Sequence, residues 1–137
     1  GTDLEPGDVL LVRTGWGQRW DTGSGYVGFD CGVPGPGEDA ARWLAAWRPR
    51  AVGADSIAFE RLAPRAGHSV LPAHRVLLVE HGINIIERLD VERLAADAVR
   101  VFGIVVAPLP LVGATGAPVR PLAIVSDAAP SASERAP

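Results

Sequence analysis

The sequence predicts an α/β fold with a mixed β-sheet and short helices packed against it. Three observations support this prediction: short runs rich in Val, Leu and Ile recur along the chain, segments of helical composition separate them, and turn residues mark most of their ends. The length of 137 residues suits one domain. The content of 47% hydrophobic and 21% charged residues argues against disorder of the whole chain.

The first half is expected to contain two strands and one helix. The apolar run DVLLVRT at residues 8–14 predicts a buried strand, and RAVGAD at residues 50–55 predicts another. Between them a helix should open at residue 37, with acidic residues in its first turn, and stop at Pro49. The glycine-rich stretch at residues 15–37 is long for a connection, and such loops are usually functional or disordered. Its aromatic residues argue against disorder because they need packing partners; they are Trp16, Trp20, Tyr26 and Phe29.

The second half continues the alternation. A helix should begin at Pro72 and end at His81, just before Gly82, because proline suits the first helical turn and glycine suits the position past the end. A strand is expected over residues 83–89, followed by a short helix over residues 91–97 that Asp90 caps. A core strand over residues 99–111, a turn over residues 112–118 and a last strand over residues 119–125 complete the domain. The Ala/Pro/Ser-rich residues 126–137 are expected to be a disordered tail, which leaves residues 1–125 as the domain.

Charge and composition exclude several classes of partner. A net charge of −3 provides no basic patch for nucleic acid or an anionic membrane, and no apolar run approaches the ~20 residues of a membrane helix. The single cysteine, Cys31, cannot form an internal disulfide, which fits a reducing, cytoplasmic location. The chain opens on Gly-Thr-Asp without Met, which indicates a processed, engineered or truncated start.

The residues that could bind a metal are few. Helical spacing would place His74, Leu77, Leu78 and His81 on one face of the helix that begins at Pro72. A histidine on an apolar face is more often a packed core residue than a ligand, because metal sites need several convergent donors. Glu87 lies in the apolar run INIIERL, where alternation favours a solvent-facing side chain and burial would require a partner. Neither a phosphate-binding glycine loop nor a Gly-x-Ser-x-Gly nucleophile turn occurs in the sequence.

Four segments together resemble one protein family. They are GDVLLVRTGW (7–16), VPGPGEDAARWLAAWRPRAVGADS (33–56), LPAHRVLLVEHGINIIERL (71–89) and APLPLVGATGAPVRPLAI (107–124). In this order they are similar to the cyclase family of metal-dependent hydrolases, which includes kynurenine formamidases and isatin hydrolases. The resemblance implies the compact, swivelling-type α/β fold of that family, with its N-terminal part missing from this chain.

The resemblance also implies an activity and a site. His74 and Glu87 match the histidine and glutamate that ligate a second divalent ion, zinc or manganese, in two-metal members. The implied activity is hydrolysis of an amide, formamide or cyclic amide bond in a small-molecule substrate, as in arylformamidases. Arg13, Trp16 and Trp20 become the substrate-side candidates, with the two tryptophans as walls for an aromatic group. Ordinary packing under a long loop is the alternative role for these tryptophans.

Two departures from the family pattern keep other functions open. The main metal motif, His-x-Gly-Thr-His-x-Asp-x-Pro-x-His, has no match here, so we expect this chain alone to be inactive. Arg88 stands where the family usually has Asn, and it could pair with Glu87. The chain could therefore be a non-catalytic truncated form, or one half of a split enzyme that forms a homo-oligomer or associates with a missing N-terminal half. A third alternative is a small zinc module built from His68, His74, His81 and Glu87.

Geometry provides a direct test of the implied ligand pair. A tight turn at Gly82 would make the helix from Pro72 and the following strand antiparallel. The helix rises about 10 Å between His74 and residue 81, and the strand covers about 13 Å to Glu87. Because these lengths nearly cancel, we expect His74 and Glu87 to face one another within reach of a single ion or a direct hydrogen bond.

Overall fold

The computed structural model of the chain describes residues 3–66 and 70–125. These residues divide into two compact units, Gly1–Ala98 and Val99–Pro137, and each is described by itself. The expected tail at residues 126–137 and the candidate ligand His68 lie outside the described residues. Within the described part, no helix is long and apolar enough to cross a membrane.

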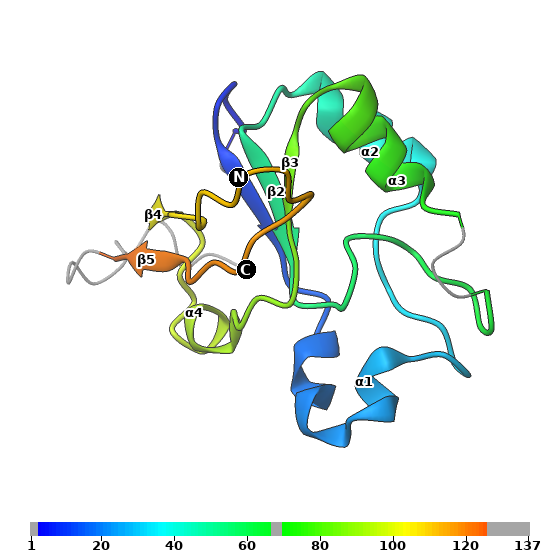
Figure 1. Ribbon diagram of the computed structural model, residues 1–137. Coiled ribbons are helices and arrows are strands. Elements are labelled where there is room, and N and C mark those ends of the chain that lie inside the picture. Colours follow the sequence, from blue (N-terminus) through cyan, green and yellow to red (C-terminus); the bar gives the residue numbers. More distant parts are fainter. Residues whose placement is uncertain (1–2, 67–69, 126–137) are drawn as a thin grey trace. The chain divides into compact units, whose positions relative to one another are not determined.

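The first unit is built on a three-stranded parallel sheet (Figure 1). Its strands are β1 (Val9–Val12), β2 (Ala51–Ala54) and β3 (Asn84–Ile86), in the order β1-β2-β3. Val9 lies opposite Ala51, and Ala51 opposite Asn84. All four residues of β2 are buried, as expected for a central parallel strand that is covered on both faces. The three predicted strands are confirmed, each shorter than its apolar run.

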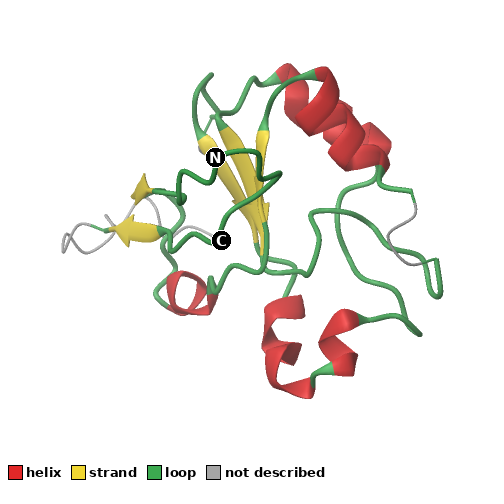
Figure 2. Cartoon of the chain, in the orientation of Figure 1, coloured by secondary structure: helices red, strands yellow, loops and turns green. Residues whose placement is uncertain are grey.

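Helices make the two crossovers between these parallel strands. Helix α2 (Glu38–Ala46) lies between β1 and β2 in sequence, and α3 (Pro72–His74) continues into the π-helix η2 (Arg75–Glu80) before β3. Helix α2 carries two acidic residues in its first turn, and α3 has proline at its start, so both helices begin as predicted. Figures 1 and 2 show α2 and α3 side by side, in agreement with their contacts.

The face of the second helix that packs inward differs from the prediction. Ala73, Val76 and Leu77 are buried, whereas Leu78 is 43% exposed and His81 is exposed. The buried face therefore starts one residue earlier than expected, at Ala73. The π-helical winding of η2 also adds residues to each turn, so α-helical spacing does not hold along it. The predicted stripe is wrong at Leu78 and His81.

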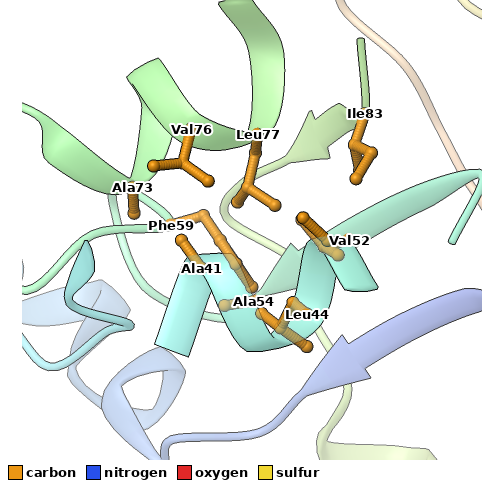
Figure 3. Close-up of a cluster of buried hydrophobic side chains, with 10 residues drawn as sticks. Ala41, Leu44, Val52, Ala54, Phe59, Ala73, Val76, Leu77 and Ile83 are labelled. Atoms are coloured by element: carbon orange, nitrogen blue, oxygen red, sulfur yellow. The ribbon is translucent and has the colours of Figure 1, made fainter. Parts of the chain in front are cut away.

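An apolar core joins α2, β2 and the α3–η2 helix (Figure 3). The buried members drawn and labelled there are Ala41, Leu44, Val52, Ala54, Phe59, Ala73, Val76, Leu77 and Ile83. Phe59 and Leu77 are among the largest fully buried side chains. Burying a side chain of this kind contributes about 1.5–3 kcal/mol, so this core fixes where the helix and the segment around Phe59 sit relative to the sheet.

The glycine- and aromatic-rich stretch is largely helical. It contains the 3₁₀-helix η1 (Trp16–Thr22) and the one-turn helix α1 (Ser24–Val27). Gly28 ends α1 with a φ of 69°, and a Cβ atom there would lie 2.6 Å from Val33 Cγ2, so the close approach requires glycine. The expectation that the aromatics pack is correct for Tyr26, which is buried, and for Trp20, which packs edge-on against Tyr26 although it is 53% exposed. Phe29 is 56% exposed.

The first unit ends with helix α4 (Glu92–Ala96). Asp90 Oδ1 accepts a hydrogen bond from the Glu92 N–H at 3.2 Å, so the predicted helix is confirmed with its acidic residue at the start.

The second unit holds an antiparallel pair, β4 (Gly103–Val105) and β5 (Leu122–Ile124), with Gly103 opposite Ile124. The strand predicted over residues 99–111 is much shorter than expected. Pro108 and Pro110 have no N–H to donate to a neighbouring strand, which limits the ladder. Parallel strands in one unit and an antiparallel pair in the other, with short helices, confirm the predicted fold class.

Candidate functional site

The candidate site lies at the carboxyl end of the parallel sheet. Thr14, Asp55 and Glu87 each follow the last residue of a strand by one or two positions, after β1, β2 and β3 respectively. Because the three strands are parallel, their carboxyl ends meet at the same edge. In open α/β sheets this edge is the usual place for a ligand.

Asp55 holds the loop after β1 against the end of β2. Its side chain is fully buried and accepts hydrogen bonds from the Thr14 N–H at 2.8 Å, the Thr14 hydroxyl at 2.6 Å and the Gly15 N–H at 2.8 Å. The Gly17 N–H donates to the same carboxylate at 3.2 Å. The Tyr26 hydroxyl donates to the backbone carbonyl of Asp55 at 2.9 Å. With so many donors satisfied, Asp55 acts as a scaffold for the loop that carries Trp16.

His74 and Glu87 come together as predicted. His74 ends α3, Glu87 follows β3, and the His74 Nε2 atom lies 3.1 Å from Glu87 Oε1. The same oxygen accepts a hydrogen bond from the Phe59 N–H at 3.4 Å. The expected convergence of the two side chains across thirteen residues is confirmed. The alternative, in which Glu87 pairs with Arg88, is not what the structure shows, because the Arg88 guanidinium lies over the ring of Trp20.

Glu60 is a third member of this group, and the sequence alone did not single it out. Its side chain is fully buried, and its Oε2 atom lies 3.3 Å from His74 Nδ1. Oε2 also accepts hydrogen bonds from the N–H groups of Ala73 at 2.8 Å and His74 at 3.2 Å. The imidazole therefore lies between a buried carboxylate at Nδ1 and a partly exposed one at Nε2.

The two carboxylates favour the charged form of the imidazole. The pKa of His74 is raised above its ordinary value, chiefly by the hydrogen bond to Glu87 and further by the bond to Glu60, against the opposing effect of burial. The imidazolium form of His74 can donate to both carboxylates at once, through Nδ1 to Glu60 and through Nε2 to Glu87. A divalent cation at Nε2 would replace the proton there, since a ligating histidine must be neutral.

Arg13 lies at the same edge but is already paired. Its Nε and Nη2 atoms donate to the two carboxylate oxygens of Glu92 at 2.8 and 2.9 Å, and Gln18 donates to Glu92 Oε2 at 2.9 Å. These bonds lower the pKa of Glu92 to about 2, with the Arg13 hydrogen bond as the largest cause. The structure places Arg13 beside the loop expected to face the substrate, with its guanidinium in a bidentate ion pair.

The two candidate tryptophans differ in exposure and partners. Trp16 is half-buried and donates its indole N–H to the carbonyl of Tyr26 at 2.8 Å, with the Arg19 guanidinium 4.2 Å above its ring. Trp20 is 53% exposed, packs edge-on against Tyr26 and carries the Arg88 guanidinium 4.8 Å above its ring. Trp20 therefore has the free surface that an aromatic substrate would need, whereas Trp16 mainly supports the loop.

The separation of the two candidate ligands fits a shared ion. Two ligands at about 2.0–2.1 Å from one ion lie about 3.3 Å apart when their angle is tetrahedral. The observed 3.1 Å between His74 Nε2 and Glu87 Oε1 is close to that spacing. Glu60 is bonded to the other ring nitrogen and is not a third ligand to such an ion. Among the described residues, no group of three or more His, Cys, Asp or Glu side chains could hold a metal ion.

Comparison with known proteins identifies relatives of the chain. The family model described as "Putative cyclase" matches residues 1–61. No curated protein matches the sequence. Among solved structures, a crystal structure of a novel cyclase is 34% identical with a TM-score of 0.76, and the match covers 90% of this chain and 42% of that chain.

Two other solved structures are similar along nearly the whole of this chain. An isatin hydrolase bound to the product analogue thioisatinate is 25% identical with a TM-score of 0.72, over 90% of this chain and 47% of that chain. A structure described as a potential metal-dependent hydrolase with cyclase activity is 32% identical with a TM-score of 0.60, over 89% of this chain and 53% of that chain. The chain spans about half the length of the structures that it matches.

Proposed function

We propose that the chain is part of a metal-dependent hydrolase of the cyclase family, in which His74 and Glu87 bind one divalent ion. The match of residues 1–61 to the cyclase family model and the similarity to solved structures of a cyclase and of a potential metal-dependent hydrolase support this proposal. The observation that carries the proposal is the 3.1 Å approach of His74 Nε2 to Glu87 Oε1 at the carboxyl end of the sheet. A relative described as a metal-dependent hydrolase supports the metal, which for these nitrogen and oxygen ligands would be zinc or manganese.

The proposed reaction is hydrolysis of an amide, formamide or cyclic amide bond in a small molecule. The similarity to an isatin hydrolase supports this substrate class. A bound divalent ion would polarise the carbonyl and lower the pKa of a bound water. The residues of this chain would hold that ion through His74 and Glu87, and the half-exposed ring of Trp20 would lie against an aromatic part of the substrate.

We further propose that donors outside the described residues complete the metal site. Catalytic zinc sites have three protein ligands and a water, and the described residues bring two suitable donors together. The further donors would come from residues that the structure does not describe or from a partner chain. The alternative, a non-catalytic chain, rests on the same shortage of ligands.

The test is zinc binding to the purified chain, observed at the imidazole ring signals by NMR, which detects weak binding. Zinc should perturb the ring signals of His74 and leave those of His81 unchanged. Glu87→Gln should weaken the effect by about tenfold or more, because it removes a charged ligand. His81→Ala is the matched control, since His81 is an exposed histidine just past the end of η2. Zinc that perturbs His81 and spares His74 would exclude the proposed site.

A further inference from the structure

Glu60 is a buried carboxylate whose position is unusually well defined. It lies in a segment that packs between α3 and the Gly35 backbone, with no side-chain exposure. A Cβ atom on Gly35 would lie only 2.3 Å from the Glu60 carbonyl oxygen, so glycine lets the two backbones approach. The Ala73 and His74 N–H groups then hold Glu60 Oε2 from the side of the helix. Little freedom remains for this carboxylate to move.

The two oxygens of the Glu60 carboxylate differ in their hydrogen bonding. Glu60 Oε1 is buried and has no hydrogen-bond partner among the described residues, while Oε2 has three nitrogen atoms within 3.3 Å. A carboxylate with one unpartnered oxygen costs free energy to bury, and an apolar side chain of similar size would avoid that cost. Capping two backbone N–H groups is one role for Glu60. The approach of the same oxygen to His74 Nδ1 indicates a second role.

We propose that Glu60 is a positioning residue that keeps the proton of the neutral His74 imidazole on Nδ1, so that the Nε2 lone pair is free to bind a divalent ion. This inference rests on the proposed function, because it assigns the orientation of one proposed ligand. A carboxylate that accepts the second ring N–H of a ligating histidine fixes the tautomer and the ring plane and increases ligand basicity.

The two carboxylates around His74 compete for the ring proton, and their surroundings decide between them. Glu60 is buried, so its hydrogen bond to Nδ1 acts in a low-dielectric environment that strengthens it. Glu87 is partly exposed, with 35% of its side-chain surface accessible, so water weakens its hold on an Nε2 proton. The contact to Glu87 is the shorter one, at 3.1 Å against 3.3 Å, but for the neutral ring we expect burial to outweigh this difference and to keep the proton on the Glu60 side.

The experiment measures the tautomer of His74 in the metal-free chain. Long-range ¹H–¹⁵N spectra of the imidazole rings would be recorded after dialysis against a chelator, with the pH increased until the His74 ring signals no longer change and the ring is neutral. The wild-type chain and Glu87→Gln should both show the proton mainly on Nδ1. Glu60→Gln keeps the volume and an acceptor oxygen for the backbone but removes the charge, and should shift the ratio towards Nε2–H by about tenfold.

A helix-capping role alone would not set the ring tautomer, so the spectra separate the two roles. A wild-type His74 that carries its proton mainly on Nε2 would overturn the proposal, as would a folded Glu60→Gln chain with an unchanged ratio. If Glu60→Gln fails to fold, the wild-type and Glu87→Gln spectra still decide the question. No metal is used, so a failure of zinc to bind would contradict the proposed function and leave the tautomer result intact.

Discussion

At the residue scale, the guanidinium of Arg13 is already occupied by an ion pair with Glu92. Both carboxylate oxygens of Glu92 accept from Arg13, and Gln18 adds a third hydrogen bond. The pair connects the loop after β1 to the start of α4, two segments that are distant in sequence. A substrate group that needed Arg13 would have to displace Glu92, so we propose that Arg13 acts mainly by orienting this loop.

The stability that this pair provides should depend on pH in a defined window. The pKa of Glu92 is lowered from 4.5 to about 2, so the contribution is fully present above pH 4.5 and is lost as the pH falls towards 2. Thermal unfolding of wild type and Glu92→Gln should therefore show a difference in melting temperature that shrinks over this range. The effect should be small and weakened by salt, because both side chains are partly exposed. Arg13→Gln should behave in the same way; a constant difference at all pH values would contradict the assignment.

The sequence predicted some members of the candidate site and missed others for a physical reason. His74 and Glu87 were accessible through the family resemblance and through the nearly equal lengths of the helix and strand that separate them. Glu60 could not be predicted in this way, because its partners Ala73 and His74 lie 13 and 14 residues further along the chain and contact it through the packing of α3 on the core. The available signal was an acidic residue directly after the apolar residues Ile57, Ala58 and Phe59, which predicts either exposure or a buried partner.

At the scale of elements, the helix that begins at Pro72 was predicted in position but not in winding. Proline at the start and glycine past the end determine its limits, and both are local features. The π-helical turns from Arg75 to Glu80 are set by packing against α2 and β3, which no short stretch of sequence encodes. As a result Leu77 and Leu78, which α-helical spacing had placed on one inward face, differ in burial.

Those leucines provide a matched pair for testing the helix phase. Leu77 is fully buried in the core and Leu78 is 43% exposed. Leu77→Ala should lower the free energy of unfolding by about 2–5 kcal/mol through lost burial and the cavity left behind. Leu78→Ala should cost less than about 1 kcal/mol, since little buried surface is lost. Chemical denaturation monitored by circular dichroism would give both values, and equal losses would show that the two side chains share one environment.

Strand positions were predicted better than strand extents. Each predicted apolar run contains a strand, because Val, Leu and Ile suit buried sheet positions. The ladders are shorter because pairing stops where the neighbouring strand stops, and β3 and β4 have only three residues each. Hydrogen-bond partners distant in the chain therefore decide the ends, and an apolar run can extend well beyond them.

At the scale of the whole molecule, the described residues of the first unit add no further strand to either edge of its sheet. β1 and β3 are the outer strands of the three, and several large apolar side chains of this unit are exposed, among them Trp43, Trp47 and Val79. Unpaired strand edges and exposed apolar surface favour association. The fold could be predicted from four sequence segments, whereas no motif in the sequence identifies a partner for these surfaces.

We therefore expect the chain to self-associate as its concentration rises. Sedimentation velocity over a wide concentration range should show an average mass that increases above that of the monomer, and a non-ionic detergent at low concentration should reverse part of the increase. Val79→Glu, at a 79% exposed position of η2, should reduce association without loss of the core. A monomer at every concentration, combined with a sharp cooperative melt, would show that the unpaired strand edges and exposed apolar side chains do not drive association.

The last expectation concerns catalysis by this chain alone. Hydrolysis at a metal centre requires an ion held by enough ligands to keep it in place while a water and the substrate occupy open positions. His74 and Glu87 supply two donors, Glu60 is bonded to the far ring nitrogen, and the described residues bring no third candidate to the ion. With zinc or manganese added, the chain should therefore hydrolyse a simple aryl formamide no faster than its His74→Ala variant does. The comparison cancels catalysis by free metal, which both samples contain equally. Turnover by the wild-type chain well above that of His74→Ala would mean that the site is complete without further donors, and would place a third ligand among residues that the present geometry leaves out.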